Sequence, residues 1–153
     1  MSFRIRKAGI ADFGRLKAIK SEFYLWECER DDRCDPAYAK KGLGARLARN
    51  LRQKKTAFFI AEQGKEIVGY VGGELQKNPA FVRYRSRGHL FNLYVKPGYQ
   101  RRGIGKALFK TALAWFKENK AQDLMLTVYT HNKVAHGIYK KFGFKDYIME
   151  MKR

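Results

Sequence analysis

The chain has 153 residues, of which 45% are hydrophobic and 14% aromatic, which favours one domain with a packed core over global disorder. Thirty-three Lys and Arg residues against 14 Asp and Glu give a formal net charge of +19, which attracts polyanions such as nucleic acid, an anionic membrane surface or a phosphorylated ligand. There is no apolar run of about 18 residues and no apolar core in the N-terminal segment, so we expect one cytoplasmic domain over 1–153 with no membrane partner.

The first half of the chain predicts one strand and two helices. Residues 3–7 alternate as in a strand, and Asp12 can cap a helix in which apolar residues recur at steps of three and four. These apolar residues are Phe13, Leu16, Ile19 and Phe23. After an acidic stretch at 27–35, Asp35 and Pro36 are typical of the start of a second helix.

The period then changes from helical to extended. Residues 56–62 and 66–76 predict two strands joined by a turn at 63–65. Gly72 and Gly73 within the second strand indicate a bulge or the close approach of another backbone or a ligand.

The second half of the chain predicts strands alternating with helices, after a basic and aromatic loop at 77–87. The expected order is strand 89–95, a helix from near Arg101, strand 124–129, helix 132–142 and strand 144–151. Cys28 and Cys34 are too few for a disulfide framework. Together with His131 and His136 they lack metal-ligand spacing, so we expect no metal.

Residues 95–106 run from a strand through a turn into a helix N-terminus, where free backbone amides and the helix dipole favour an anion. Gly103 and Gly105 lack the Cβ atoms that would keep a pyrophosphate away from those amides. The positive side chains in the turn are Arg101, Arg102 and Lys106.

Two common phosphate motifs do not fit this turn. A P-loop requires Gly and Ser or Thr where Gln100 and Ala107 stand. A dinucleotide fingerprint requires a third Gly where Leu108 stands.

Three linked patterns within residues 88–145 resemble the GNAT superfamily of acyl-CoA N-acyltransferases. The pyrophosphate-loop pattern is Gln100-x-x-Gly103-x-Gly105. The strand leading into it is Leu93-Tyr94-Val95-x-Pro97. The downstream pattern is Asn132-x-x-Ala135-x-x-x-Tyr139-x-x-x-Gly143-Phe144.

This resemblance implies an α/β (α+β) fold with a mixed, mostly antiparallel central sheet, splayed between strands 4 and 5 and flanked by about four helices. It also implies an acetyl-CoA-dependent N-acetyltransferase that acts on a primary amine of a small molecule or a protein. The residues that it assigns to acetyl-CoA are Leu93, Tyr94, Val95, Gln100, Arg101, Arg102, Gly103, Ile104, Gly105, Lys106, Asn132 and Tyr139.

The resemblance makes Tyr139 the general acid that protonates the leaving thiolate, although its place on an apolar helix stripe equally fits a core residue. A general base is harder to assign, because Phe91, Asn92 and Thr127 occupy the positions where relatives carry a glutamate. We take Glu74 as the first candidate. The other candidates are His89, Glu22, Glu27 and a water relay.

Two other functions stay open. One is a CoA-binding GNAT-fold sensor or interaction protein without turnover. The other is a basic module associated with nucleic acid or a ribosome, with the 77–87 loop as its contact, although a solvated lysine-rich surface explains the charge as well. A homodimer partner could complete an edge of the sheet.

Overall fold

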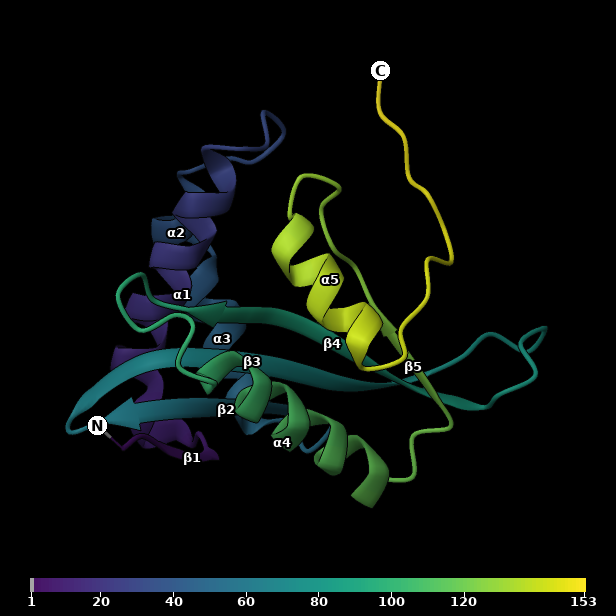
Figure 1. Ribbon diagram of the computed structural model, residues 1–153, viewed down its shortest axis with the longest axis horizontal. Helices are drawn as coiled ribbons and strands as arrows, with labels where there is room; N and C mark the ends of the chain where they lie inside the picture. The colour runs from purple at the N-terminus through teal and green to yellow at the C-terminus, as the bar shows by residue number, and fades with distance from the viewer. Residues whose placement is uncertain (1) are drawn as a thin grey trace.

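The computed structural model describes residues 2–153 and has a five-stranded sheet in the order β1-β2-β3-β4-β5 (Figure 1). The strands are β1 Arg4–Lys7, β2 Thr56–Gln63, β3 Glu66–Lys77, β4 Ser86–Val95 and β5 Asp123–Leu126. The α-helices are α1 Phe13–Cys28, α2 Tyr38–Lys41, α3 Leu43–Arg52, α4 Ile104–Glu118 and α5 Lys133–Lys141, with a 3₁₀ turn, η1, at Ile10–Asp12. β1 to β4 are antiparallel, and β4 with β5 is parallel. None of the described helices has the length and apolar character needed to cross a bilayer.

Helices cover both faces of the sheet, so β2 and most of β3 are buried on both sides. α4 lies on one face, where Leu108 and Phe116 pack against Val71 and Leu90. α1 and α3 lie on the opposite face in a second apolar cluster. That cluster is centred on Leu16, Ile19, Leu47, Phe58 and Tyr70. The predicted apolar stripe of α1 is therefore confirmed as the face that this helix buries, and α4 buries a stripe of the same kind.

The sheet is splayed between β4 and β5, as predicted. The two strands pair only where Arg87 to Leu90 face Asp123 to Leu126. β4 continues beyond Leu90 to Val95, and this last part has no pairing partner in β5. The result is a split at one end of the sheet, bordered by the last five residues of β4.

A β-bulge interrupts the pairing of β3 with β4 beside this split. Gly72 faces Phe91 and Tyr70 faces Tyr94, so β4 carries one residue more than β3 between these pairs. The extra residue is accommodated at Asn92, whose φ of 53° is left-handed. The sequence predicted an irregularity here from Gly72, but the additional residue lies on the partner strand. The space over Gly72 is filled by the ring of Phe91.

Asp12 has a role other than the predicted helix cap. Its carboxylate makes no capping bond to α1 and accepts two hydrogen bonds from Arg6, at 2.7 and 2.8 Å. Arg15 adds a third at 2.6 Å, and Arg6 also binds Glu62 on β2. Because Asp12 is only 5% exposed, this paired cluster is the reason that a carboxylate can be buried there. It joins β1 and β2 to the start of α1.

The predicted strand at 144–151 is wrong. No described strand pairs with this segment, and its apolar side chains after Phe144 are exposed, with Tyr147 at 76%. The segment extends away from α5 towards the C-terminus (Figure 1). Its contacts include the packing of Phe144 on Phe109, an ion pair of Asp146 with His136 at 2.6 Å and an ion pair of Lys152 with Asp32. A run of apolar residues predicted a strand, but no partner strand is available at that position.

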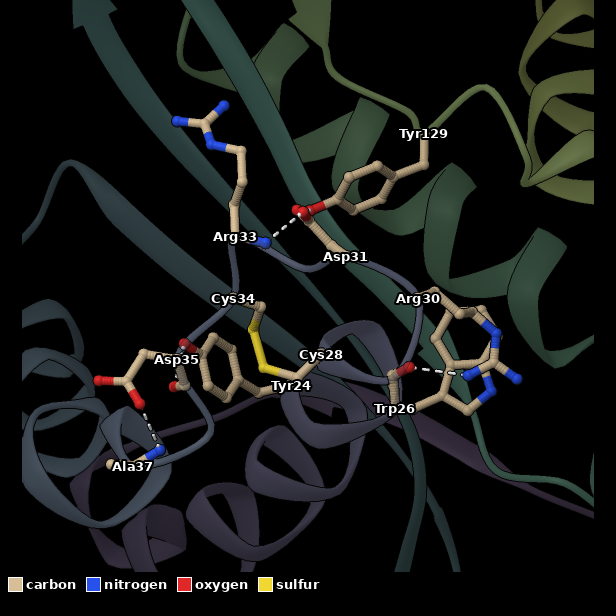
Figure 2. The surroundings of a disulfide bond; sticks show 10 residues. All are labelled: Tyr24, Trp26, Cys28, Arg30, Asp31, Arg33, Cys34, Asp35, Ala37 and Tyr129. Carbon is tan, nitrogen blue, oxygen red and sulfur yellow. Dashed lines mark hydrogen bonds between the residues drawn. A yellow bond between two sulfur atoms is a disulfide. The ribbon is translucent and has the colours of Figure 1, made fainter. Parts of the chain in front are cut away.

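Cys28 and Cys34 form a disulfide, which the sequence did not predict (Figure 2). Cys28 is the last residue of α1, and Cys34 precedes the segment that leads to α2, with a Cα–Cα distance of 4.9 Å. The bond closes the acidic segment between them into a small loop. A single disulfide is not a framework, but this one links the end of α1 to the segment that leads to α2.

Candidate active site

The last residues of β4 present alternate side chains to the two layers of the protein. Leu93 and Val95 pack against the cluster under α4, and Tyr94 lies in the cluster under α1. The Tyr94 hydroxyl donates to Glu22 on α1 at 2.8 Å, which fixes the ring. The backbone of these three residues therefore lies at the edge of the split.

The predicted phosphate turn connects this strand to α4. Tyr99 N–H donates to the Lys96 carbonyl at 3.0 Å, and the Gln100 side chain donates to the Val95 carbonyl at 2.9 Å. Gln100 thus attaches the turn to the end of β4. Arg101 has a φ of 62°, a left-handed conformation that is uncommon for a residue with a side chain.

α4 begins at Ile104, directly after this turn. Gly103 is its N-cap with a φ of 82°, which only glycine adopts without strain. The helix's first hydrogen bond runs from Ala107 N–H to the Gly103 carbonyl at 3.0 Å, so the amides of residues 104–106 precede the helical ladder. Buried Ile104 anchors this end in the core, at 2% exposure.

The surroundings of the α4 N-terminus suit a pyrophosphate. A Cβ on Gly103 would have no atom within 4 Å, and one on Gly105 would lie 3.7 Å from Val95 Cγ2. The space beside the free amides is therefore open, and the side chains of Arg101, Arg102 and Lys106 around it are exposed. Two phosphates in this space would gain hydrogen bonds from the amides and charge from these side chains.

α5 carries the predicted general acid, Tyr139, on its buried side. The Tyr139 ring centroid lies 5.4 Å from that of Phe109 on α4 and 6.4 Å from that of Phe144. Burial raises the pKa of its phenol to about 12, so the group holds its proton at neutral pH. Tyr139 is thus a core residue, and it also has the protonation state that an acid requires.

Asn132 begins α5. Its side-chain oxygen accepts from Ala135 N–H at 3.2 Å, so it acts as the N-cap. The resemblance assigns Asn132 a cofactor contact, and the structure shows the capping role that fixes the position of this helix.

Two of the candidate bases, Glu74 and His89, face each other on neighbouring strands. Glu74 on β3 faces His89, in the part of the sheet where β4 is still paired with β5. Its carboxylate accepts from Gln76 at 3.2 Å and lies 3.4 Å from Lys55 Nζ. Burial lowers the pKa of His89, which keeps this imidazole neutral.

The two glutamates on α1 differ from each other. Glu22 accepts the bond from Tyr94 and has Lys96 at 4.0 Å, so it belongs to a charged surface network. Burial raises the pKa of Glu27, with nearby Lys20 acting in the opposite direction. Sequence reasoning missed Lys20, whose side chain reaches the bulge of β4.

The disulfide loop borders the split from the α1 side. Asp31 in this loop accepts a hydrogen bond from the Tyr129 hydroxyl at 2.7 Å (Figure 2). Tyr129 follows β5, so this bond connects the two sides of the splayed sheet. The two residues are 98 positions apart in the sequence, so no local sequence pattern indicates this hydrogen bond.

The basic loop at 77–87 lies far from these residues. It forms the tip of the β3–β4 hairpin, which projects from the body of the protein (Figure 1). Phe81 is 89% exposed there, and Arg83 and Arg85 are exposed beside it. Among residues 2–153 no group of three or more His, Cys, Asp or Glu is arranged to hold a metal ion.

A split sheet with a glycine-capped helix N-terminus beside it offers room for a ligand with an extended arm and an anionic end. The acetyltransferase (GNAT) family model matches residues 50–144, more than half of the chain. The chain belongs to the GNAT family.

Individual relatives support this membership. An N-alpha-acetyltransferase of Sulfurisphaera tokodaii is 34% identical over 105 residues, which cover 63% of this chain and 61% of the relative. A spermidine N(1)-acetyltransferase of Thermoplasma acidophilum is 28% identical over 166 aligned positions, covering 99% of this chain and 98% of the relative. The first match thus spans about three fifths of that relative's length.

Solved structures show the same fold. A predicted acetyltransferase from Clostridium acetobutylicum, solved with acetyl-CoA, superposes with a TM-score of 0.80 at 20% identity. The superposition covers 99% of this chain and 96% of that one.

Proposed function

We propose that this protein is an acetyl-CoA-dependent N-acetyltransferase that acetylates a primary amine of a small molecule or a protein. The observation that carries the proposal is the combination of an open, positively charged α4 N-terminus with the end of β4 that has no partner in β5 at the split. A ligand with a pyrophosphate at one end and an extended arm at the other fits both. The family of the chain supports the same ligand.

In this proposal the backbone of Leu93 to Val95 binds the pantetheine arm. The amides at 103–106 with Arg101, Arg102 and Lys106 bind the pyrophosphate. Asn132 orients α5 and contacts acetyl-CoA from that side. An amide near Val95 stabilises the negative charge that develops on the thioester oxygen.

Acetyl-CoA supplies the acetyl group: a bond forms between the amine nitrogen and the acetyl carbon, the C–S bond of the thioester breaks, and CoA leaves as a thiolate. Tyr139 donates the proton that the thiolate needs, which its raised pKa makes available at neutral pH. The acceptor amine must lose a proton before it attacks. We assign Glu74 to take that proton through water. Its carboxylate already contacts Lys55 and Gln76, and Glu74 faces His89 on β4, away from the residues at the end of that strand.

A thermal-shift experiment tests acetyl-CoA binding, with ADP as the phosphate control. Acetyl-CoA at about a hundred times its Kd should stabilise the fold by about 2.7 kcal/mol, and ADP should stabilise it less. An equal shift with both ligands, or none, would contradict the proposal and favour a protein that only binds phosphates.

Turnover with different amines then distinguishes the acceptor classes and separates an enzyme from a CoA-binding sensor. The named activities of the relatives suggest spermidine and a peptide with a free N-terminal amino group as the first two acceptors. Release of CoA with one and not the other identifies the class. A cytoplasmic location, a homodimer, and association with nucleic acid or a ribosome stay predictions from the sequence.

A further inference from the structure

Lys20 is a cation inside the apolar layer between α1 and the sheet. Its Nζ donates to Asn92 Oδ1 on β4 at 3.0 Å. Its Nζ also lies 5.1, 5.2 and 5.9 Å from the ring centroids of Phe58, Tyr70 and Phe91. These rings come from β2, β3 and β4, so the ammonium is in contact with three strands at once.

Asn92 is the residue that makes the bulge. Its left-handed φ of 53° is one that asparagine tolerates better than most residues with a side chain. The hydrogen bond from Lys20 holds its side chain on the α1 face. β4 loses its pairing with β5 after Leu90, so Asn92 and residues 93–95 lie on the part of β4 that borders the split and stays paired with β3 alone.

The environment of Lys20 lowers the pKa of its ammonium group, but the group stays protonated at neutral pH. Burial lowers its pKa to about 8, nearby Arg46 on α3 acts in the same direction, and Glu27 on α1 opposes them. On the strands, burial raises the pKa of Tyr70, whose ring centroid lies 5.2 Å from Lys20 Nζ, so Tyr70 faces Lys20 as a neutral group. Elsewhere on β4, burial raises the pKa of Tyr94 and lowers that of His89. Lys20 is therefore charged below about pH 8 and loses its charge as pH rises through that value.

We propose that Lys20 is a positioning residue for acetyl-CoA binding. Its hydrogen bond to Asn92, strengthened by the three aromatic rings, holds the β4 bulge and so fixes the backbone of residues 93–95 at the split. The inference rests on the proposed function, because it assigns a purpose to an arrangement beside the proposed pantetheine site. It also explains why a lysine, costly to bury, occupies this layer.

The first test compares Lys20→Met with Lys17→Met, a lysine one turn earlier on the same helix. Acetyl-CoA affinity is measured by calorimetry at pH 7, after each variant's melting curve has shown a cooperative transition. Lys20→Met should bind about tenfold more weakly, the scale of one lost hydrogen bond to a charged group, and Lys17→Met should bind as the wild type does. Wild-type affinity in Lys20→Met would overturn the proposal.

The second test uses pH and Asn92, and it gives a readout that mere packing would not change. Wild-type affinity should fall as pH rises through about 8, with no such step in Lys20→Met. Asn92→Asp should move the step to higher pH, because a carboxylate stabilises the ammonium. Asn92→Gly keeps the left-handed backbone without the bond, so it should restore part of the affinity that Asn92→Leu loses.

The outcomes separate the two proposals. A wild-type protein that does not bind acetyl-CoA refutes the proposed function itself. A wild-type protein that binds it with no step near pH 8, or a step that Asn92→Asp leaves in place, overturns the role of Lys20 alone. If Lys20→Met fails to fold, the wild-type and Asn92→Asp pH series decide the question.

Discussion

The change Tyr139→Phe separates the proposed acid role of Tyr139 from its packing role. Phenylalanine keeps the ring between Phe109 and Phe144 and removes one hydroxyl. Burial alone accounts for the raised pKa of this hydroxyl, and no described residue gives it a hydrogen bond. The free energy of unfolding should therefore change by less than about 1 kcal/mol.

Turnover should fall much more. A positioned general acid contributes about 10² to 10⁴ in rate, and a thiolate is a comparatively good leaving group, so we expect a loss at the low end, at least about tenfold. The assay follows the free thiol of CoA with a thiol reagent, using whichever amine the acceptor screen identifies. Acetyl-CoA affinity, measured separately, should stay nearly unchanged. Tyr147→Phe is the matched control, since Tyr147 is 76% exposed and lies outside the site.

Equal turnover in Tyr139→Phe and wild type would remove Tyr139 from the mechanism and leave it as a core residue. A loss of turnover accompanied by an equal loss in Tyr147→Phe would point to the assay. A loss accompanied by a lower melting temperature would assign the effect to packing.

Three further predictions concern the site and the fold. Gly103→Val and Gly105→Val should each weaken acetyl-CoA binding without unfolding the chain, and unchanged affinity in both would refute the phosphate-binding assignment; Gly103→Val should also lower the melting temperature, because its left-handed backbone strains a β-branched residue. Glu74→Gln should lower turnover most at low pH with little effect on acetyl-CoA affinity, and an unchanged pH–rate profile would exclude Glu74 as the base. Asp12→Asn should cost about 3 kcal/mol in urea unfolding at pH 7, because it breaks a buried pair with Arg6. Since Arg6 holds the pKa of Asp12 well below its usual range, this stability is present above the unfolded pKa and lost as pH falls, so the two proteins should converge in acid.

Local patterns predicted the geometry of the segments to which we assign acetyl-CoA. Gly103 and Gly105 follow a strand and start a helix, so their conformation and exposure follow from neighbours in sequence. Tyr139 was predicted on a buried helix face for the same reason. Those positions depend on spacing within one segment, which a sequence shows directly.

Contacts between distant segments were not predictable in this way. Lys20 and Asn92 are 72 residues apart, and each alone is an ordinary polar residue on a helix or a strand. The side chain of Asp12 was expected to cap a helix. It pairs with Arg6 instead, because two charged hydrogen bonds stabilise a buried carboxylate more than one bond from a helix amide does. At 144–151 the apolar pattern was real, but the described sheet offers this segment no edge with which to pair.

The two apolar clusters on opposite faces of the sheet have a consequence for how this protein could diversify. The α4 cluster lies beside the segments to which we assign acetyl-CoA, whereas α1, α2 and most of α3 precede the family match, which begins at residue 50. The α1 cluster joins these helices to strands inside the match, including Phe58 and Tyr70, so substitutions in α1 to α3 can change the packing on this face of the sheet while α4 keeps its own packing on the other. A chimera that takes its first 49 residues from a relative should therefore keep the acetyl-CoA binding that we propose, provided that the contact at Asn92 is matched.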